Sequence, residues 1–268
     1  MILDHFQTKD LNHIAEHLFH LSFTENEIPF ESTVLPSGCM SITHIYGKNQ
    51  TAIYNETKFP LKGTIITGQF YKSYQFQVNS SGTSCGISFH PTAIYKLTEL
   101  DVSNLTEKHL PLEAASKFLF NILNPIFTNY KGDINTLCKT LEESISALPL
   151  TYNDTINEID EVINIINIKE GMLSTYELLD HVSFSQKTLE TQFKKIIGLT
   201  PGKYIRLYRF LKLMKKYETK KIDLKDLIYM YNYYDQSHFI KDFKHFMNQN
   251  PKDYFKIEHP FINEYLNI

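Results

Sequence analysis

An internal repeat in the C-terminal part is the feature that most constrains how this chain can fold. The segments TLETQFKKIIGLTPGKY (188–204) and HFIKDFKHFMNQNPKDY (238–254) superimpose with a constant offset of 50 residues. The matched pairs include Phe193 with Phe243, Lys194 with Lys244, Pro201 with Pro251, and Tyr204 with Tyr254. A sequence that recurs at a fixed period predicts two copies of one structural unit.

Each copy is predicted to be an amphipathic helix that follows a short helix and a tight turn. In the second copy, Phe239, Phe243 and Phe246 form an apolar stripe at helical spacing, and Asp235 stands at the N-cap position. The opposite face is polar and basic, with Ser237, His238, Lys241, Lys244 and His245. This layout is that of a helix-turn-helix, whose second helix enters the major groove of DNA.

A longer helix is predicted between the two copies. Thr200 is its expected N-cap and Pro201 its first residue, and the helical pattern continues to about Tyr217. At 1.5 Å per residue such a helix is roughly 27 Å long. It can therefore hold two recognition helices about one DNA turn, ~34 Å, apart on one face of a duplex.

The charge of the chain is unevenly distributed. Residues 187–256 contain 16 basic and 7 acidic residues, which gives +9, whereas the whole chain carries -3 and the remainder therefore -12. A basic part joined to an acidic part is typical of a DNA-binding domain fused to a partner domain.

The remaining bulk features favour a soluble cytoplasmic protein without membrane contact. The N-terminal residues lack the apolar core of a signal peptide, and no run of 18 apolar residues occurs. The three cysteines are far apart and odd in number, which favours reduced thiols and small buried side chains over disulfides: Cys39, Cys85 and Cys138.

The N-terminal part is predicted to be β-rich. MSITHIY (40–46) alternates, with Ile42 and His44 on one side of a strand and Thr43 and Ile45 on the other. Further strands are expected at 64–70, 71–78 and 85–89, separated by turn residues. Several short strands at even spacing suggest a barrel-like or sandwich-like domain.

From about residue 112 the apolar period becomes helical, and 149–153 is the predicted domain boundary. The expected fold class is α+β in two domains. Residues 1–150 form a β-rich sensing or dimerisation domain with trailing helices, and residues 151–268 form an all-α domain of two helix-turn-helix units.

Residues 155–257 closely resemble the DNA-binding domain of AraC-type bacterial transcription regulators. In the second unit the resemblance rests on Tyr233, Tyr234, Asp235, Gln236, Ser237, His238, Phe239, Phe243, Pro251 and Tyr254. In the first unit it rests on Leu189, Phe193, Gly198, Pro201 and Tyr204. The resemblance implies a sequence-specific DNA-binding transcription regulator that is not an enzyme and needs no cofactor.

The N-terminal part also resembles the β-rich, cupin-like domain that is often attached to this module. The matching pieces are 35–39, 68–69, 86–91 and 111–113. The resemblance implies a domain that senses a ligand or forms a homodimer.

The sequence departs from the AraC-type pattern at several positions. Leu179 and Ile228 occupy places that are usually small, where the first helix of each unit crosses the second. Asn232 replaces the usual glycine of the second turn, and asparagine tolerates a left-handed conformation. Thr191 replaces a usual arginine, which puts the first unit's grip on DNA in doubt.

The predicted DNA contacts lie outside the apolar stripes. In the second unit we expect Gln236, His238 and Lys241 at base edges, and Ser237 and Lys244 nearer the backbone. In the first unit the candidates are Lys187, Glu190, Thr191 and Lys194, although a solvated carboxylate is the alternative for Glu190. Phosphate contacts are expected from Lys203, Arg206 and Lys216, for which ordinary solvated side chains are the alternative.

If the N-terminal domain binds a small-molecule effector, seven residues are the predicted lining of the pocket. They are Ile42, His44, Tyr46, Phe70, Tyr74, Phe76 and Phe89. The alternative is that these side chains fill a core.

An enzymatic reading rests on few residues. His13, Glu16 and His17 match the H-x-x-E-H zinc pattern, but the resemblance places them at a strand, where the two histidines cannot share a helical face. His44 and His90 are isolated strand histidines, which favours hydrogen-bonded structural roles. No metal site and no catalytic residue is therefore predicted.

The sequence thus predicts a transcription regulator that binds promoter DNA under control of its N-terminal domain. RNA polymerase and a second copy of the chain are candidate partners. One alternative is a constitutive DNA-binding adaptor that recruits a protein, and another is a metal-dependent cupin enzyme fused to DNA-binding helices. The sequence leaves activation or repression open.

Overall fold

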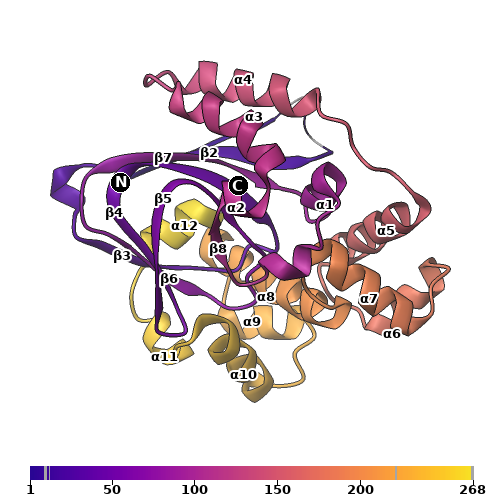
Figure 1. Cartoon of the computed structure of the whole chain (residues 1–268). Coiled ribbons are helices and arrows are strands. Elements are labelled where there is room, and N and C mark those ends of the chain that lie inside the picture. Colours follow the sequence, from indigo (N-terminus) through magenta and orange to yellow (C-terminus); the bar gives the residue numbers. More distant parts are fainter. Residues whose placement is uncertain (9–10, 12, 221, 267–268) are drawn as a thin grey trace.

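The structure is a computed structural model that describes residues 1–8, 11, 13–220 and 222–266 (Figure 1). An eight-stranded sheet, in which every pairing is antiparallel, makes up most of the first 111 residues. Its strands are β1 (Ile2–Phe6), β2 (Ala15–Phe23), β3 (Phe30–Val34), β4 (Met40–Tyr54), β5 (Thr57–Thr67), β6 (Tyr74–Val78), β7 (Gly82–Phe89) and β8 (His109–Pro111). The order is β1-β2-β7-β4-β5-β8, and β6 pairs with both β3 and β4.

One face of the sheet is covered by helices of the N-terminal part (Figure 1). These helices are α1 (Ala93–Thr98), α2 (Leu112–Ala115), α3 (Lys117–Thr128) and α4 (Ile134–Ser146). Met40 and Ile42 of β4 pack in the same core as Leu119 and Leu123 of α3. The change to helical structure that was predicted from about residue 112 is confirmed, because α2 starts at Leu112.

The other face of the sheet lines a second core. Ile45 of β4, Leu61 and Ile65 of β5, and Phe76 of β6 belong to it. Phe261 of the last helix, α12 (Pro260–Leu266), is buried in the same cluster. Since the N-terminal helices cover one face of the sheet and α12 packs on the other, β4 is buried on both sides.

The strands differ in extent from the prediction. Ile2–Phe6 and Ala15–Phe23 add two strands upstream of the predicted β-rich region. Residues 68–73, which were predicted to belong to strands 64–70 and 71–78, form an irregular connection between β5 and β6. At the start of this connection only glycine fits at position 68, because a Cβ there would lie 1.8 Å from the carbonyl oxygen of Leu105.

The rest of the chain is helical. It contains α5 (Asp154–Ile168), α6 (Thr175–Leu178), α7 (Gln186–Ile197), α8 (Pro201–Lys220), α9 (Leu224–Met230), α10 (Gln236–Met247), α11 (Pro251–Tyr254) and α12, with a 3-10 turn at Leu179–His181. Helix α8 starts at Pro201 as predicted and continues beyond Tyr217. In the described part of the chain, no helix has the length and apolarity needed to cross a membrane.

The sequence repeat is a structural repeat. Helices α7 and α10 have the same bounds after a shift of 50 residues. Ser185 and Asp235 cap their N-termini by accepting hydrogen bonds from the backbone of Thr188 and His238. Both helices end at a left-handed residue, Gly198 with φ 94° and Asn248 with φ 54°. The predicted cap at Asp235 is confirmed.

Candidate DNA interface and ligand cavity

Helices α7 and α10 bury equivalent residues and expose equivalent residues. Their buried side chains pair at the repeat offset: Leu189 with Phe239, Phe193 with Phe243, Ile196 with Phe246, and Ile197 with Met247. On the outer side, Lys187, Glu190, Thr191 and Lys194 of α7 are exposed, as are Gln236, Ser237, Lys241 and Lys244 of α10, with His238 partly exposed. Every predicted base-reading candidate is thus accessible at a helix surface.

The short first helices of the units pack as a helix-turn-helix requires. Ile228 of α9 is buried, and Leu179 is partly buried against the same core. These larger residues therefore fill the crossings that are usually small in the AraC-type pattern. Asn232 has φ 53°, so it takes up the left-handed conformation expected in place of glycine.

The candidates for phosphate contacts are already engaged within the protein. The Lys203 ammonium lies 5.3 Å from the ring centre of Tyr71, and Lys216 donates to the Glu170 carboxylate over 2.8 Å. The Arg206 guanidinium is 2.6 Å from Oδ1 of Asp242. All three side chains keep partial or full exposure. They can therefore contact DNA only after they give up these partners within the protein.

Asp242 is a buried structural residue that the sequence prediction missed. It is 0% exposed, on the apolar side of α10, and its carboxylate accepts hydrogen bonds from Arg206, Arg209 and the Tyr233 hydroxyl. These bonds tie α10 to α8 and to the turn before α10. The sequence did carry a signal for this role. Asp242 falls on the apolar face of its helix, and the preceding long helix has two arginines, Arg206 and Arg209, three residues apart.

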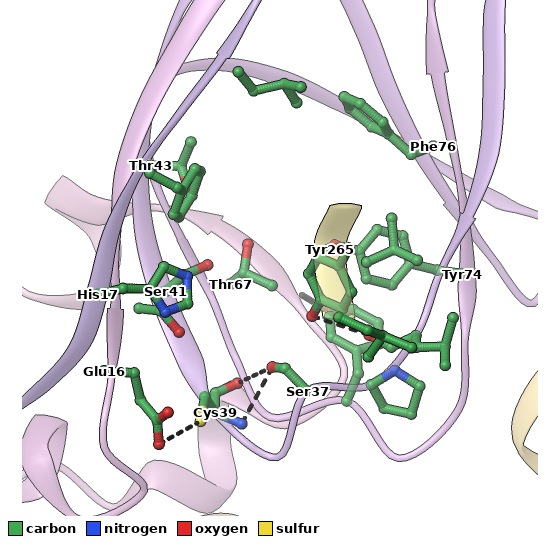
Figure 2. A pocket seen from close by; sticks show the side chains of 18 of the residues that line it. Glu16, His17, Ser37, Cys39, Ser41, Thr43, Thr67, Tyr74, Phe76 and Tyr265 are labelled. Atoms are coloured by element: carbon green, nitrogen blue, oxygen red, sulfur yellow. Dashed lines mark hydrogen bonds between the residues drawn. The ribbon is translucent and has the colours of Figure 1, made fainter. Parts of the chain in front are cut away.

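A cavity of about 310 Å³ lies between the concave face of the sheet and the C-terminal helices. Figure 2 shows His17, Ser41 and Thr43 on one wall, with Tyr74 and Phe76 facing them from across the space. Helix α8 contributes Tyr204, Tyr208, Leu211, Lys212 and Lys215 to the lining, and α12 contributes Phe261, Tyr265 and Leu266. The same helix that joins the two DNA-binding units therefore forms part of the cavity wall.

Three of the seven predicted pocket residues line this cavity, and four do not. Phe70, Tyr74 and Phe76 are in its wall. Ile42, His44, Tyr46 and Phe89 lie elsewhere, so their placement is a correction to the prediction. On β4 the cavity is lined by Ser41, Thr43 and Ile45, the opposite set of the alternation.

The four predicted residues that do not line the cavity face the N-terminal helices instead. The His44 ring stacks on Phe127 of α3 at 5.7 Å and its Nδ1 is 2.7 Å from Thr64 Oγ1. The Tyr46 hydroxyl donates to the Phe127 carbonyl over 2.7 Å. His44 therefore has the hydrogen-bonded structural role that an isolated strand histidine favours.

Several buried polar groups in the cavity wall have no hydrogen-bond partner among the described residues. Both side-chain polar atoms of Gln50, Nδ1 of His17 and Nε2 of His109 are in this state. Gln50 is 2% exposed, His17 7% and His109 8%. Unpaired buried polar atoms are costly, so these groups favour an occupant that can hydrogen-bond to them.

Burial keeps the cavity histidines neutral. It lowers the pKa of His109 to about 4. It also lowers the pKa of His17 to about 4, with a further lowering by the charge of His5, whose ring centre is 4.9 Å away. At neutral pH these side chains therefore offer uncharged donors and acceptors to the cavity.

The residues of the zinc pattern do not share a helix. His13 lies in a turn, whereas Glu16 and His17 lie on β2 at an irregularity of the strand, where Glu16 is exposed and His17 is buried. Glu16 instead contacts His90, whose Nδ1 is 3.1 Å away, and Cys39. Among the residues that the structure describes, no three His, Cys, Asp or Glu side chains are grouped so as to hold a metal ion.

Comparison with protein families divides the chain into two matches. A helix-turn-helix domain family matches residues 178–257, which run from the last residue of α6 to just beyond α11. A domain of unknown function (DUF6597) matches residues 7–111, the region of the sheet.

Two similar proteins are transcription regulators by name. The HTH-type transcriptional activator AarP of Providencia stuartii is 29% identical over 113 residues, which are 40% of this chain and 84% of that protein. An uncharacterised HTH-type transcriptional regulator of Staphylococcus aureus is 25% identical over 242 residues, or 82% of this chain. The chain spans about a third, 31%, of the length of that staphylococcal regulator.

The whole fold also has a counterpart among solved structures. A ligand-free variant of ToxT from Vibrio cholerae superimposes with a TM-score of 0.50 at 11% sequence identity. The match covers 90% of this chain and 96% of that one, so it includes the sheet and both helix-turn-helix units.

Proposed function

We propose that this chain, which carries a DNA-binding domain of the AraC type, is a one-component transcription regulator controlled through its cavity. The helix-turn-helix domain is the part that binds DNA, and similar proteins of this kind act as transcription regulators. Control by an effector, homodimerisation, contact with RNA polymerase and a cytoplasmic location are further parts of the proposal.

The observation that carries the proposal is the structural repeat. Two recognition helices with identical bounds after a shift of 50 residues expose polar and basic side chains, and helix α8 connects the two units to which they belong. Twenty residues of α-helix span about 30 Å, close to one turn of DNA, ~34 Å. This geometry suits two successive major grooves on one face of a duplex.

The cavity supports control by a small molecule. Its wall combines aromatic and aliphatic side chains with a few polar groups, the usual make-up of a ligand site. The unpaired amide of Gln50 and the neutral imidazole of His109 favour an occupant with hydrogen-bonding groups on a mostly apolar body. Because α8 forms part of the wall, an occupant contacts the DNA-binding domain directly.

Selection of bound DNA from randomised duplexes tests the DNA-binding part of the proposal. The whole chain is used at near-physiological salt with competitor DNA, beside the double variant Gln236→Ala/Lys241→Ala as a matched control. We expect a sequence motif for the parent chain and a weaker or altered motif for the control. Recovery of only salt-sensitive background by the parent chain would contradict the proposal.

Ligand control is tested separately by thermal stability. A library of small apolar molecules with hydrogen-bonding groups is screened against the parent chain and Gln50→Met. A ligand that binds the native cavity raises the melting temperature of the parent chain by mass action and that of Gln50→Met less. Equal shifts in both proteins would place the binding elsewhere.

A further inference from the structure

The connection between β5 and β6 contacts both halves of the molecule. We call residues 68–73 the strap. It leaves the sheet after Thr67 and rejoins it at Tyr74. Gly68 and Phe70 line the cavity, whereas Gln69 and Tyr71 pack against the DNA-binding helices.

The strap reaches the end of the first recognition helix through Gln69. A Cβ placed on Gly198, the C-cap of α7, would lie 3.3 Å from Cβ of Gln69 and 2.7 Å from Oγ1 of Thr106. Thr106 Oγ1 also donates to the Gly198 carbonyl over 2.9 Å, and Glu107 donates its backbone N–H to the Gln69 carbonyl. The strap and the neighbouring turn therefore pack directly on the end of α7.

The strap reaches the end of the second recognition helix through Tyr71 and Ser73. The Ser73 N–H donates to the Phe246 carbonyl over 2.7 Å, and Asn248 Nδ2 donates to the Ser73 carbonyl over 3.3 Å. The Tyr71 ring is 5.3 Å from that of Phe246 and 5.0 Å from that of His245. Tyr71 is 7% exposed and belongs to the core of the DNA-binding helices rather than to that of the sheet.

The strap also occupies two of the predicted phosphate contacts. The Lys203 ammonium lies 5.3 Å from the centre of the Tyr71 ring, and the Arg206 guanidinium interacts electrostatically with the Tyr71 side chain. A cation that lies over an aromatic ring must leave the ring before it can reach a phosphate. Contact of Lys203 with a DNA phosphate therefore requires that its ammonium leave the Tyr71 ring.

The cavity contacts the strap at Phe70. The Phe70 ring packs between Tyr54, Tyr74 and His109, with ring centres 5.1, 4.8 and 4.9 Å away. Phe70 and Tyr71 are consecutive residues, so a displacement of Phe70 by an occupant of the cavity is transmitted to Tyr71. A packed core rearranges between discrete states rather than yielding gradually.

From these contacts we propose that the strap is an autoinhibitory element that couples the cavity to both recognition helices. Docked, it fixes the ends of α7 and α10 relative to the sheet and holds the exposed Lys203 ammonium over the Tyr71 ring. Undocked, it frees the two units, whose separation α8 still fixes, to dock on DNA as one body. An effector that displaces Phe70 shifts the balance towards the undocked state. This inference rests on the proposed function, because it assumes that the helix-turn-helix units bind DNA.

Two substitutions loosen the strap without touching a predicted base contact. Tyr71→Ala removes the ring from the second unit and from Lys203. Asn248→Gly removes only the donation to Ser73, and glycine keeps the left-handed C-cap of α10, so this variant is expected to fold normally. Gln75→Ala is the matched control, since Gln75 is exposed on β6 just beyond the strap.

The test is the affinity of each full-length protein for a selected duplex and for a random duplex across a range of salt concentrations. We expect Tyr71→Ala to bind the selected duplex about tenfold more tightly than the parent chain, equivalent to about 1.4 kcal/mol. Asn248→Gly is expected to bind two- to threefold more tightly, and Gln75→Ala like the parent chain. Release of Lys203 should also steepen the salt dependence for Tyr71→Ala by about one counterion.

The alternative outcomes are distinct from one another. Specific binding by the parent chain, with equal or weaker binding by both strap variants, would overturn autoinhibition and leave the proposed function intact. If Tyr71→Ala alone loses DNA binding and its circular dichroism is altered, the loss reflects misfolding. The affinity of Asn248→Gly for the selected duplex then decides whether the strap is autoinhibitory. If no protein distinguishes the selected from the random duplex, the proposed function fails and the strap inference fails with it.

Discussion

At the scale of single residues, a few side chains decide how the helices are held. The repeat-related phenylalanines at 193 and 243 are 0% exposed, and their identity was enough to predict two equivalent helices. Asp242 could not be predicted in the same way, because its role depends on arginines that approach from a different helix. Sequence spacing shows which residues share a face, but not which polar group a neighbouring element brings to that face.

Loss of the Asp242 carboxylate should destabilise the second unit strongly. Asp242→Ala leaves Arg206, Arg209 and the Tyr233 hydroxyl without their common acceptor, which costs about 3 kcal/mol or more. Urea unfolding of the whole chain measures the loss. Asp253→Ala is the matched control, because its ion pair with Lys256 is exposed and should change the free energy of unfolding by less than about 0.5 kcal/mol. Equal effects of the two variants would contradict the role of Asp242.

Because of its buried histidines, we expect the free energy of unfolding of the protein to fall in acid. The pKa of His109 is lowered to about 4 by burial, below the ordinary value of 6.5, so the unfolded chain binds a proton that the folded chain excludes. The stabilising contribution is therefore fully present above about pH 6.5 and is lost as the pH falls from there towards 4.

The size of this effect is at most about 1.4 kcal/mol per pH unit for each such histidine. Urea unfolding at pH 7, 6 and 5 of the parent chain and of His109→Phe isolates the contribution, since all other titrating groups are shared. We expect a shallower loss of stability in the variant. Parallel curves would show that His109 is not held neutral by its surroundings.

At the scale of elements, the helices were easier to predict than the faces of the strands. Helix starts carry local signals, such as Asp235 and Pro201, which act within a single turn. Strand β4 alternates clearly, but both of its sides are buried, one under α3 and α4 and the other towards α12 and the cavity. The alternation therefore gave the two sets of residues and could not say which set faces the cavity.

The two recognition helices should contribute unequally to DNA binding. At repeat-related positions α7 exposes Thr191 and α10 exposes Lys241. Lys241→Ala should weaken specific binding by about 1–3 kcal/mol and relax the preference at one base pair. Thr191→Arg should tighten binding by adding a cation where α7 has none. Fluorescence anisotropy with single-base variants of the selected duplex measures both.

Two results would contradict this assignment of the recognition helices. A uniform loss on all duplexes for Lys241→Ala would make Lys241 a phosphate contact instead of a base contact. Unchanged affinity for Thr191→Arg would mean that α7 does not enter the groove in the expected orientation. Lys252→Ala, an exposed lysine at the start of α11, serves as the control for a general loss of positive charge.

At the scale of the whole molecule, the DNA-binding helices and the sheet are joined by more than a linker. Helices α8 and α12 complete the wall of the cavity, and the strap touches the ends of both recognition helices. The two halves, with their opposite charge, could be recognised from the sequence. Their mutual packing could not, because contacts such as that of Tyr71 with Phe246 join residues far apart in the chain and carry no local pattern.

The central claim is that two units on one rigid helix read two DNA elements about one turn apart. The most direct test is the affinity of the parent chain for its selected duplex with 5 or 10 base pairs inserted between the two half-elements. Because α8 fixes the separation, we predict that both insertions reduce binding to the level of a single half-element. Undiminished affinity for either duplex would contradict the claim that α8 sets the spacing.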